Sequence, residues 1–206
     1  MQAASLRDEV HALKSRYGRD RRELARLAKA NVFNDTFCIG HDAAGGSGCA
    51  TINGLRLGRL PGASVDWPEI NAAWGHALLL LHTVARKHTF SFASYTLVPL
   101  GSFSKVEHLD ERGAVAGAYE LYGSGDFAVG RLLHNRRFDL AMVAFLDCMR
   151  QMAQHLKRVL NVDVPHAIVR DKIGDVSIKL QFSSDDTWTK ALRHVLLNLK
   201  VILAAT

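Results

Sequence analysis

The feature that most constrains the fold is a pattern that occurs three times along the chain: strand-like segments followed by one amphipathic helix. In the strand-like segments apolar residues alternate with polar ones, whereas in each helix they recur every three or four residues. Antiparallel hairpins that each pack one face against a following helix build an α+β domain. We therefore predict an α+β fold with three β-sheet–α-helix repeats in one globular domain, preceded by a helical or coiled-coil segment.

The first repeat is predicted to begin with strands at 31–39 and 51–60, joined by a glycine-rich turn at 43–48. The following helix opens at Asp66, with Pro68 in its first turn and Glu69 in position to complete a capping box. Its spacing predicts these inward residues: Ile70, Ala73, Trp74, Ala77, Leu78 and Leu81.

In the second repeat, strands near 89–98, 102–109 and 117–122 are predicted to precede a helix from about 138 to 160. In the third, an extended stretch at 164–170 and a strand at 176–182 precede a helix that starts at Ser184 or Asp185. The predicted inward residues of these two helices are Met142, Phe145, Leu146, Met149 and Leu156, then Trp188, Leu192, Leu196, Leu199 and Ile202.

Residues 1–30 follow a different pattern, that of a coiled coil. Apolar side chains alternate in steps of three and four, and the pattern is broken at Asp20. Its members are Leu6, Val10, Leu13, Tyr17, Leu24 and Leu27. We expect 1–30 to be the end of a coiled-coil helix and 31–206 to be the globular domain. Such a narrow stripe either pairs with a partner helix or folds back on the domain.

The charge is concentrated in the same segment. Residues 1–30 carry +4 of the net charge of +6, so the domain is nearly neutral. A basic helix of this kind is compatible with a basic helix-led nucleic-acid-binding protein, which we keep as the alternative function. The three cysteines show no C-x-x-C spacing, so we expect neither a disulfide framework nor a zinc knuckle.

The sequence shows no arrangement typical of catalysis. The ten histidines are scattered, and Cys148 lies in an apolar helix, where cysteine usually acts as a small hydrophobic residue. Residues 123–128 (GSGDFA) fit a dinucleotide-binding pattern, but such a site needs a helix that starts within the motif, and 129–137 shows no helical stripe. We expect a protein that is not an enzyme, with no catalytic residue, cofactor or metal. The alternative is a nucleotide-dependent enzyme, and thermal stabilisation by NAD or FAD would support it.

A segment at 130–137, predicted to be a loop, combines two leucines with several arginines. Leu132 and Leu133 lie between Arg131 on one side and Arg136 and Arg137 on the other, with His134 next to them. Leucines flanked by arginines are typical of a loop tip that inserts into an anionic membrane. The alternative is that the leucines cap the domain's own core.

Six collinear strings make the chain resemble the C-terminal domain of the Beclin-type autophagy proteins. They are NVFNDTF at 31–37, TINGLRLGRLP at 51–61, EINAAWG at 69–75, YTLVP at 95–99, FDLAMVAFLDC at 138–148 and WTKAL at 188–192. The resemblance runs from about residue 29 to residue 200. It implies a domain of three β-sheet–helix repeats preceded by a coiled coil, in agreement with the pattern above.

The resemblance implies a non-catalytic subunit of the class III phosphatidylinositol 3-kinase complex, acting in autophagy and endosomal trafficking. Its implied partners are the catalytic and scaffold subunits of that complex, a coiled-coil partner subunit and an anionic membrane surface. It implies a cytoplasmic protein that is peripheral on endosomal and autophagic membranes. The family's upstream segment and longer coiled coil do not precede residue 1, so we expect a part of a longer protein or a shortened homologue.

The family presents an aromatic finger, Phe-Phe-Trp, to the membrane. The corresponding residues here are Leu132, Leu133 and His134, between Arg131 and the Phe-Asp pair at 138–139. The leucines keep the capacity to insert, but the aromatic rings that favour the membrane interface are gone. His134 would add to anionic binding only when protonated.

Overall fold

The computed structural model describes residues 11–23, 36–42, 48–60, 65–123, 131–181 and 183–206, with the backbone alone at 131–135. The chain divides into two compact units, residues 1–35 and 36–206, which are considered separately. In the first unit, residues 11–23 form a helix. The second unit holds the sheets and the remaining helices.

Three small antiparallel sheets of three strands each follow one another along the second unit, and their strands are ordered as in the sequence. The first consists of β1 (Ile39–His41), β2 (Ala50–Ile52) and β3 (Leu55–Leu57). The second consists of β4 (Tyr95–Val98), β5 (Lys105–Leu109) and β6 (Val115–Glu120), with the 3-10 turn η1 (Gly101–Phe103) before β5. The third consists of β7 (Ile168–Val169), β8 (Lys172–Ile173) and β9 (Val176–Ser177).

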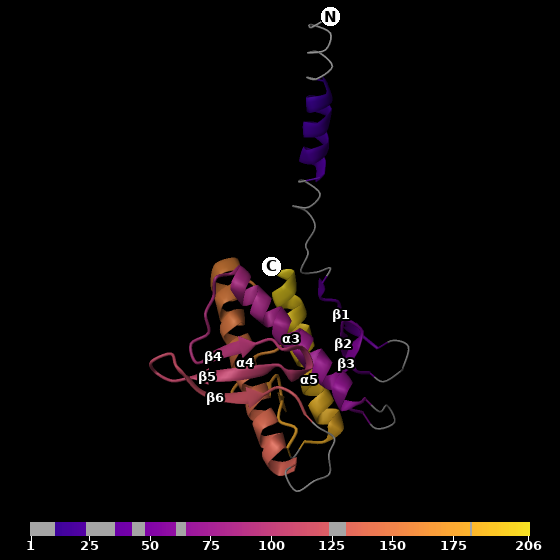
Figure 1. The fold of residues 1–206 in the computed structure, drawn as a ribbon. Coiled ribbons are helices and arrows are strands. Elements are labelled where there is room, and N and C mark those ends of the chain that lie inside the picture. The colour runs from indigo at the N-terminus through magenta and orange to yellow at the C-terminus, as the bar shows by residue number, and fades with distance from the viewer. Residues whose placement is uncertain (1–10, 24–35, 43–47, 61–64, 124–130, 182) are drawn as a thin grey trace, which may run out of the picture. The chain divides into compact units, whose positions relative to one another are not determined.

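One long helix follows each sheet: α3 (Trp67–Lys87), α4 (Arg131–Leu160) and α5 (Asp185–Ala204). The helices contact one another, and the sheet β4–β5–β6 lies across α4 (Figure 1). Every inward residue predicted for the three helices is buried. The rings of Trp74 and Phe145 meet edge to face at 5.3 Å, which joins α3 to α4 at the centre of the core. The predicted α+β fold with three sheet–helix repeats is confirmed; its coiled-coil part stays a prediction.

The strand boundaries differ from the prediction in each repeat. The segment 51–60 is two strands rather than one, because Asn53 and Gly54 adopt positive φ angles of 52° and 77° and form a tight hairpin turn. The first strand begins only at Ile39, and the predicted residues 31–35 lie outside the described part of the chain, as do 43–47 of the glycine-rich turn. In the second repeat, residues 89–94 are not part of β4.

The third repeat also differs, because it folds as two very short hairpins in place of the longer strands predicted at 164–170 and 176–182. The helix starts follow the prediction in part. Ser184 caps α5 by accepting a hydrogen bond from the Thr187 backbone N–H. Asp66 stands at the N-cap of α3 without a side-chain cap bond, and Glu69 pairs with Arg56 at 2.8 Å instead of completing a capping box.

Candidate functional site

The candidate site is the N-terminal end of α4, and its local structure corrects the prediction. The segment 130–137 was expected to be a loop, but α4 starts at Arg131, about two turns before the predicted start at 138. The N-terminal turns of α4 extend past strand β6 (Figure 1). The sequence from 131 to 137 has no apolar stripe with helical spacing, so the periodicity that reveals helices was missing.

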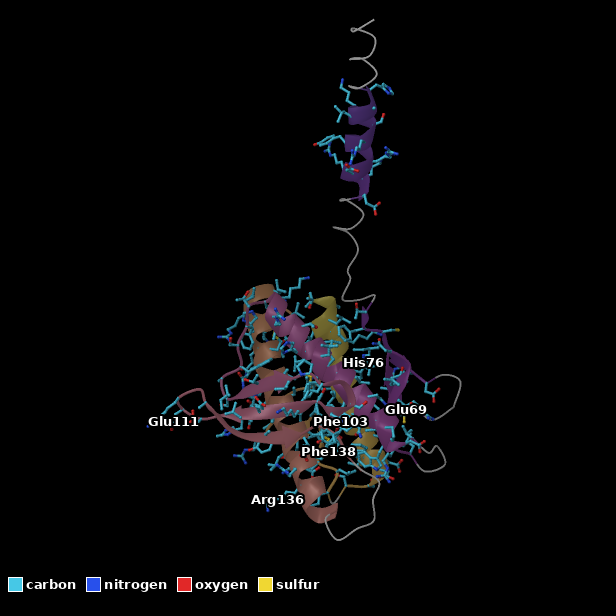
Figure 2. All side chains as sticks on the ribbon, in the orientation of Figure 1. Glu69, His76, Phe103, Glu111, Arg136 and Phe138 are labelled. Carbon is cyan, nitrogen blue, oxygen red and sulfur yellow. The ribbon has the colours of Figure 1, made fainter. Side chains whose placement is uncertain are left out.

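Phe138 fixes this end of α4 to the other two helices. Its side chain is 1% exposed, and its ring lies 5.8 Å from the Trp67 ring, 6.5 Å from that of Trp74 and 6.3 Å from that of Trp188. Such edge-to-face contacts add about 0.5–1.5 kcal/mol per pair beyond the burial of apolar area. Figure 2 shows Phe138 inside the domain and Arg136 at the outer end of the same helix. The helix is therefore anchored close to its projecting end.

Asp139 adds a polar anchor next to Phe138. Its buried carboxylate accepts hydrogen bonds from the backbone N–H groups of Leu180 at 2.7 Å and Gln181 at 3.2 Å. Burial raises the pKa of the Asp139 carboxyl, and these two hydrogen bonds oppose that shift because they favour the charged form. The anchor ties α4 to the segment that leads into α5.

The chain is also fixed where it approaches α4 from β6, at Gly123. The Asn71 side chain donates to the Gly123 carbonyl and accepts from the Gly123 N–H, each at 2.8 Å. A Cβ atom at Gly123 would overlap the Trp67 ring, so only glycine fits. Residues 124–130, between this clamp and α4, lie outside the described part of the chain.

The electrostatics of this helix end are unusual for the domain. Helix dipoles favour acidic residues in the first turn, and α3 has Glu69 there while α5 has Asp185 and Asp186. The first turn of α4 has no acidic residue. Arg136 and Arg137 are exposed, and the Arg137 guanidinium lies 3.7 Å from the Glu120 carboxylate. The end of α4 therefore concentrates positive potential.

The predicted membrane-binding residues all lie in this part of α4. Arg131, Leu132, Leu133 and His134 are in its first turns, where the structure describes the backbone alone. Arg136 and Arg137 follow with described side chains. Neither the insertion of the leucines nor their alternative place in the core is tested by the structure.

Two of the predicted coiled-coil residues lie in the helix of the first unit. Leu13 is 65% exposed and Tyr17 is 70% exposed, and a spacing of four places them on one face of the helix. Leu6, Val10, Leu24 and Leu27 lie outside the described residues. Their pairing stays a prediction.

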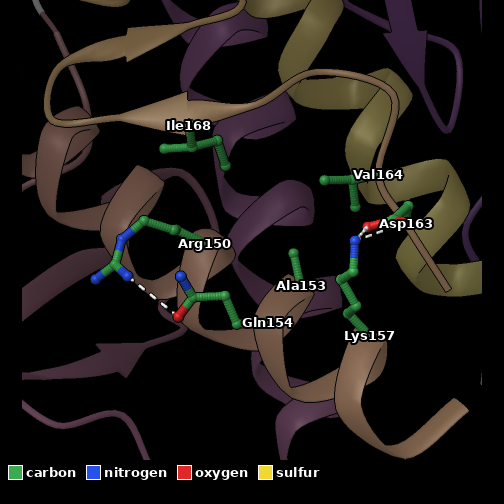
Figure 3. Close-up of a pocket in the computed structure, with 7 residues that line it drawn as sticks. All are labelled: Arg150, Ala153, Gln154, Lys157, Asp163, Val164 and Ile168. Carbon is green, nitrogen blue, oxygen red and sulfur yellow. Dashed lines mark hydrogen bonds and ion pairs between the residues drawn. The ribbon is translucent and has the colours of Figure 1, made fainter. Parts of the chain in front are cut away.

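A cavity of about 170 Å³ lies beside α4, far along the helix from the candidate site (Figure 3). Arg150 and Lys157 line it, but Arg150 bonds to Asp147 and Gln154, and Lys157 pairs with Asp163 at 2.7 Å. Ala153, Val164 and Ile168 complete the lining. Because its charges are already compensated, the cavity offers no strong site for an ionic ligand.

The features that could suggest an enzyme have structural explanations. Strand β6, which precedes the GSGDFA segment, belongs to an antiparallel sheet, whereas dinucleotide binding uses parallel βαβ units. The sequence predicted no helix directly after this motif, but α4 does start soon after it, at Arg131. Burial raises the pKa of the Cys148 thiol well above its usual range, which disfavours a nucleophilic thiolate. Among the described side chains, no group of three or more His, Cys, Asp or Glu could hold a metal ion.

Sequence reasoning missed the clamp formed by Asn71, Trp67 and Gly123. Asn71 and Gly123 are 52 positions apart, and neither carries a periodic signal. Trp67 could have been found, because it lies seven residues before Trp74 and therefore on the buried face of the same helix. In the part of the chain that the structure describes, no helix has the length and apolarity needed to cross a membrane.

A family model described as the Apg6 BARA domain matches residues 27–206. The chain is 44% identical over 220 residues to the vacuolar protein sorting-associated protein 30 of Gibberella zeae, covering 98% of the chain and 44% of that protein. It is 48% identical over 181 residues to the Beclin-1-like protein B of Dictyostelium discoideum, covering 87% of the chain and 20% of the relative. Over 213 residues it is 40% identical to Beclin-1 of Xenopus laevis, covering 98% and 46% respectively.

The chain thus spans less than half the length of each of these relatives. Their names describe Beclin proteins and vacuolar protein sorting, and none of the three names an enzymatic activity or a nucleic acid.

Proposed function

Since the chain belongs to the Apg6 BARA domain family of Beclin-type proteins, we propose that it is the membrane-docking and protein-interaction module of a non-catalytic subunit in autophagy and vacuolar or endosomal sorting. The complex we propose is that of the class III phosphatidylinositol 3-kinase, with its catalytic and scaffold subunits and a coiled-coil partner. The module would be cytoplasmic and peripheral on endosomal and autophagic membranes. Family membership supports the role in sorting, and the assignment to this particular kinase complex is the more specific part of the proposal.

The observation that carries the docking proposal is the acid-free, arginine-rich start of α4. In α3 and α5, acidic side chains of the same chain offset the positive end of the helix dipole, but the first turn of α4 contains none. An anionic lipid surface would supply the missing negative charge. Leu132 and Leu133 lie in the first turn of α4, which is the end of the helix that we propose to meet this surface.

The magnitudes are sufficient for reversible docking. Full burial of one leucine side chain contributes about 1.5–3 kcal/mol, so the leucine pair could contribute about 3–6 kcal/mol. Each arginine close to an anionic membrane adds about 1 kcal/mol. Such a contact is too weak to be a permanent anchor, and it fits a subunit that holds a complex on a membrane together with other contacts.

The rigid anchoring of α4 supports this role as well. A tip transmits orientation to the rest of a complex only if its base is fixed, and Phe138 and Asp139 fix the base of this one to α3 and to the segment before α5. The exposed Leu13 and Tyr17 supply the second proposed surface, which would pair with a partner helix.

Flotation with liposomes tests the docking proposal directly. We would compare the chain with a Leu132→Asp/Leu133→Asp variant on vesicles that contain anionic lipid. The matched control is Leu100→Asp/Val115→Asp, because these two side chains are 55% and 58% exposed elsewhere on the domain and receive the same charge. The proposal predicts that the tip variant loses at least about tenfold in bound fraction while the control keeps its binding.

A second pair of variants separates charge from insertion. Arg136→Glu/Arg137→Glu should weaken flotation strongly at low salt and less at high salt, since exposed charges are screened over about 10 Å at 0.1 M salt. Equal binding of the chain and both tip variants would contradict the docking proposal. Binding to duplex nucleic acid stronger than binding to vesicles would favour the nucleic-acid alternative.

A further inference from the structure

A pair of histidines joins the third sheet to α5. His166 stands just before β7 and His194 lies on α5, and their rings stack with centroids 3.7 Å apart and planes 14° apart. Both side chains are half-buried. The stack therefore forms part of the contact that holds the two short hairpins of β7–β9 against the helix.

The neighbouring backbone keeps the two rings in place. The Asn198 side chain accepts from the His166 N–H at 3.0 Å and donates to the His166 carbonyl at 2.8 Å. His194 Nδ1 lies 3.3 Å from the Ile173 carbonyl oxygen. A Cβ atom at Gly174 would lie 3.2 Å from Nδ1 of His194 and 3.6 Å from Nδ1 of His166, so the Gly174 backbone lies close to both rings.

Besides His194, the charged groups that act on the His166 ring are Asp175, at the turn between β8 and β9, and Lys190, one turn before His194 on α5. They form an ion pair with an N–O distance of 2.7 Å. Because Lys190 offsets the charge of Asp175, the carboxylate is only a partial counter-ion for a protonated ring. Burial lowers the pKa of the His166 imidazole, and the nearby His194 lowers it further.

We propose that the stacked pair His166–His194 is a pH-sensitive contact, which holds the third sheet on α5 while the rings are neutral and loosens it when both rings are protonated. Two neutral imidazoles can stack as aromatic rings, whereas two imidazolium cations at the same distance repel each other. This contact is separate from the proposed membrane-docking site at the start of α4.

The sign of the effect follows from the lowered pKa. In the open state, in which the third sheet is loosened from α5, the rings take up protons near the ordinary histidine pKa of about 6.5. As the pH falls, this happens before the rings of the closed, stacked state are protonated. The contact is therefore fully present above about pH 6.5 and is lost as the pH falls from there through the lower value of the closed state. Two unit charges 3.7 Å apart in a water-like medium shift an equilibrium by about tenfold.

Amide hydrogen exchange on the full chain at pH 7.4 and pH 5.0 tests the proposal, after correction for the intrinsic pH dependence of exchange. The reporters are the Gly174 N–H, bonded to the Ala167 carbonyl, and the Ile178 N–H, bonded to the Asp171 carbonyl. We expect the opening equilibrium at these amides to rise about tenfold at pH 5.0, with a smaller change in the centre of α3.

Two variants make the test specific. His194→Phe keeps an aromatic ring in the stack but cannot be protonated, so the pH effect at both amides should become smaller, because only the effect of burial on His166 remains. Asp175→Asn removes the partial counter-ion and should enlarge the effect. An equal pH response in the chain and in His194→Phe would overturn the proposal.

Direct titration of the two rings by NMR does not depend on the folding of any variant. The proposal predicts two separate titration steps for the pair, because the first proton opposes the second. Coincident titration of both rings near pH 6.5 would also overturn it.

Discussion

Phe138 is the side chain whose removal should most clearly detach the start of α4 from the core. Phe138→Ala removes a fully buried ring from among three tryptophans, and such truncations cost about 3–5 kcal/mol through lost apolar burial and the remaining cavity. Leu140, two residues later on the same helix, is 42% exposed. Leu140→Ala should therefore cost only about 1 kcal/mol.

Urea unfolding followed by far-UV circular dichroism measures this difference. With a slope of about 2 kcal/mol/M, the midpoint should fall by about 2 M in Phe138→Ala and by about 0.5 M in Leu140→Ala. Phe138→Leu, which keeps most of the volume, should cost about 1.5 kcal/mol. Equal midpoints for the two alanine variants, or a cost below about 1 kcal/mol for Phe138→Ala, would refute the aromatic anchor of α4.

Three further changes test other parts of the account. Gly123→Ala should lower the free energy of unfolding by about 1–3 kcal/mol in thermal unfolding, because its Cβ overlaps the Trp67 ring. The control is Gly117→Ala, which should have little effect because there is open space around Gly117. Equal melting temperatures of the two variants would contradict the clamp at Gly123. Ser184→Ala should cost about 1 kcal/mol by removing the cap of α5, and unchanged urea unfolding would count against it. Burial lowers the pKa of His88, whose buried Nε2 has no hydrogen-bond partner among the described residues. The free energy of unfolding should therefore fall as the pH drops below about 6.5, and it should fall less in His88→Leu; identical pH profiles would exclude this contribution.

The sequence predicted the helices well because each buries a continuous apolar stripe with helical spacing. Ile70, Met142 and Trp188 illustrate this, since each is fully buried as predicted. The strands were harder because each has only two to six residues, too few for an alternating pattern to stand out. The Asn-Gly pair at 53–54 is a recognisable hairpin signal, but the prediction of one continuous strand at 51–60 did not use it.

The candidate site could be predicted only in part. The arginines and leucines at 131–137 are visible in the sequence, but their helical conformation is not, because apolar residues do not recur there with helical spacing. The supporting contacts join residues far apart in the chain: Asp139 to Leu180, and Asn71 to Gly123. In both contacts the polar side chain bonds to backbone groups, which are the same in every residue type and therefore cannot be recognised in the sequence. Such contacts become apparent only when the three repeats are packed together.

Co-purification of lipid kinase activity tests the central claim, membership of the phosphatidylinositol 3-kinase complex. The tagged full-length protein would be isolated from its own cells and the eluate assayed for phosphatidylinositol 3-phosphate formation. A Val10→Asp/Leu13→Asp variant, which alters the predicted coiled-coil stripe, would be compared with Lys14→Asp, a control beside the stripe. The account predicts activity in the eluates of the unchanged protein and the control, and its loss in the stripe variant. Absence of activity from a folded, unchanged protein would contradict it.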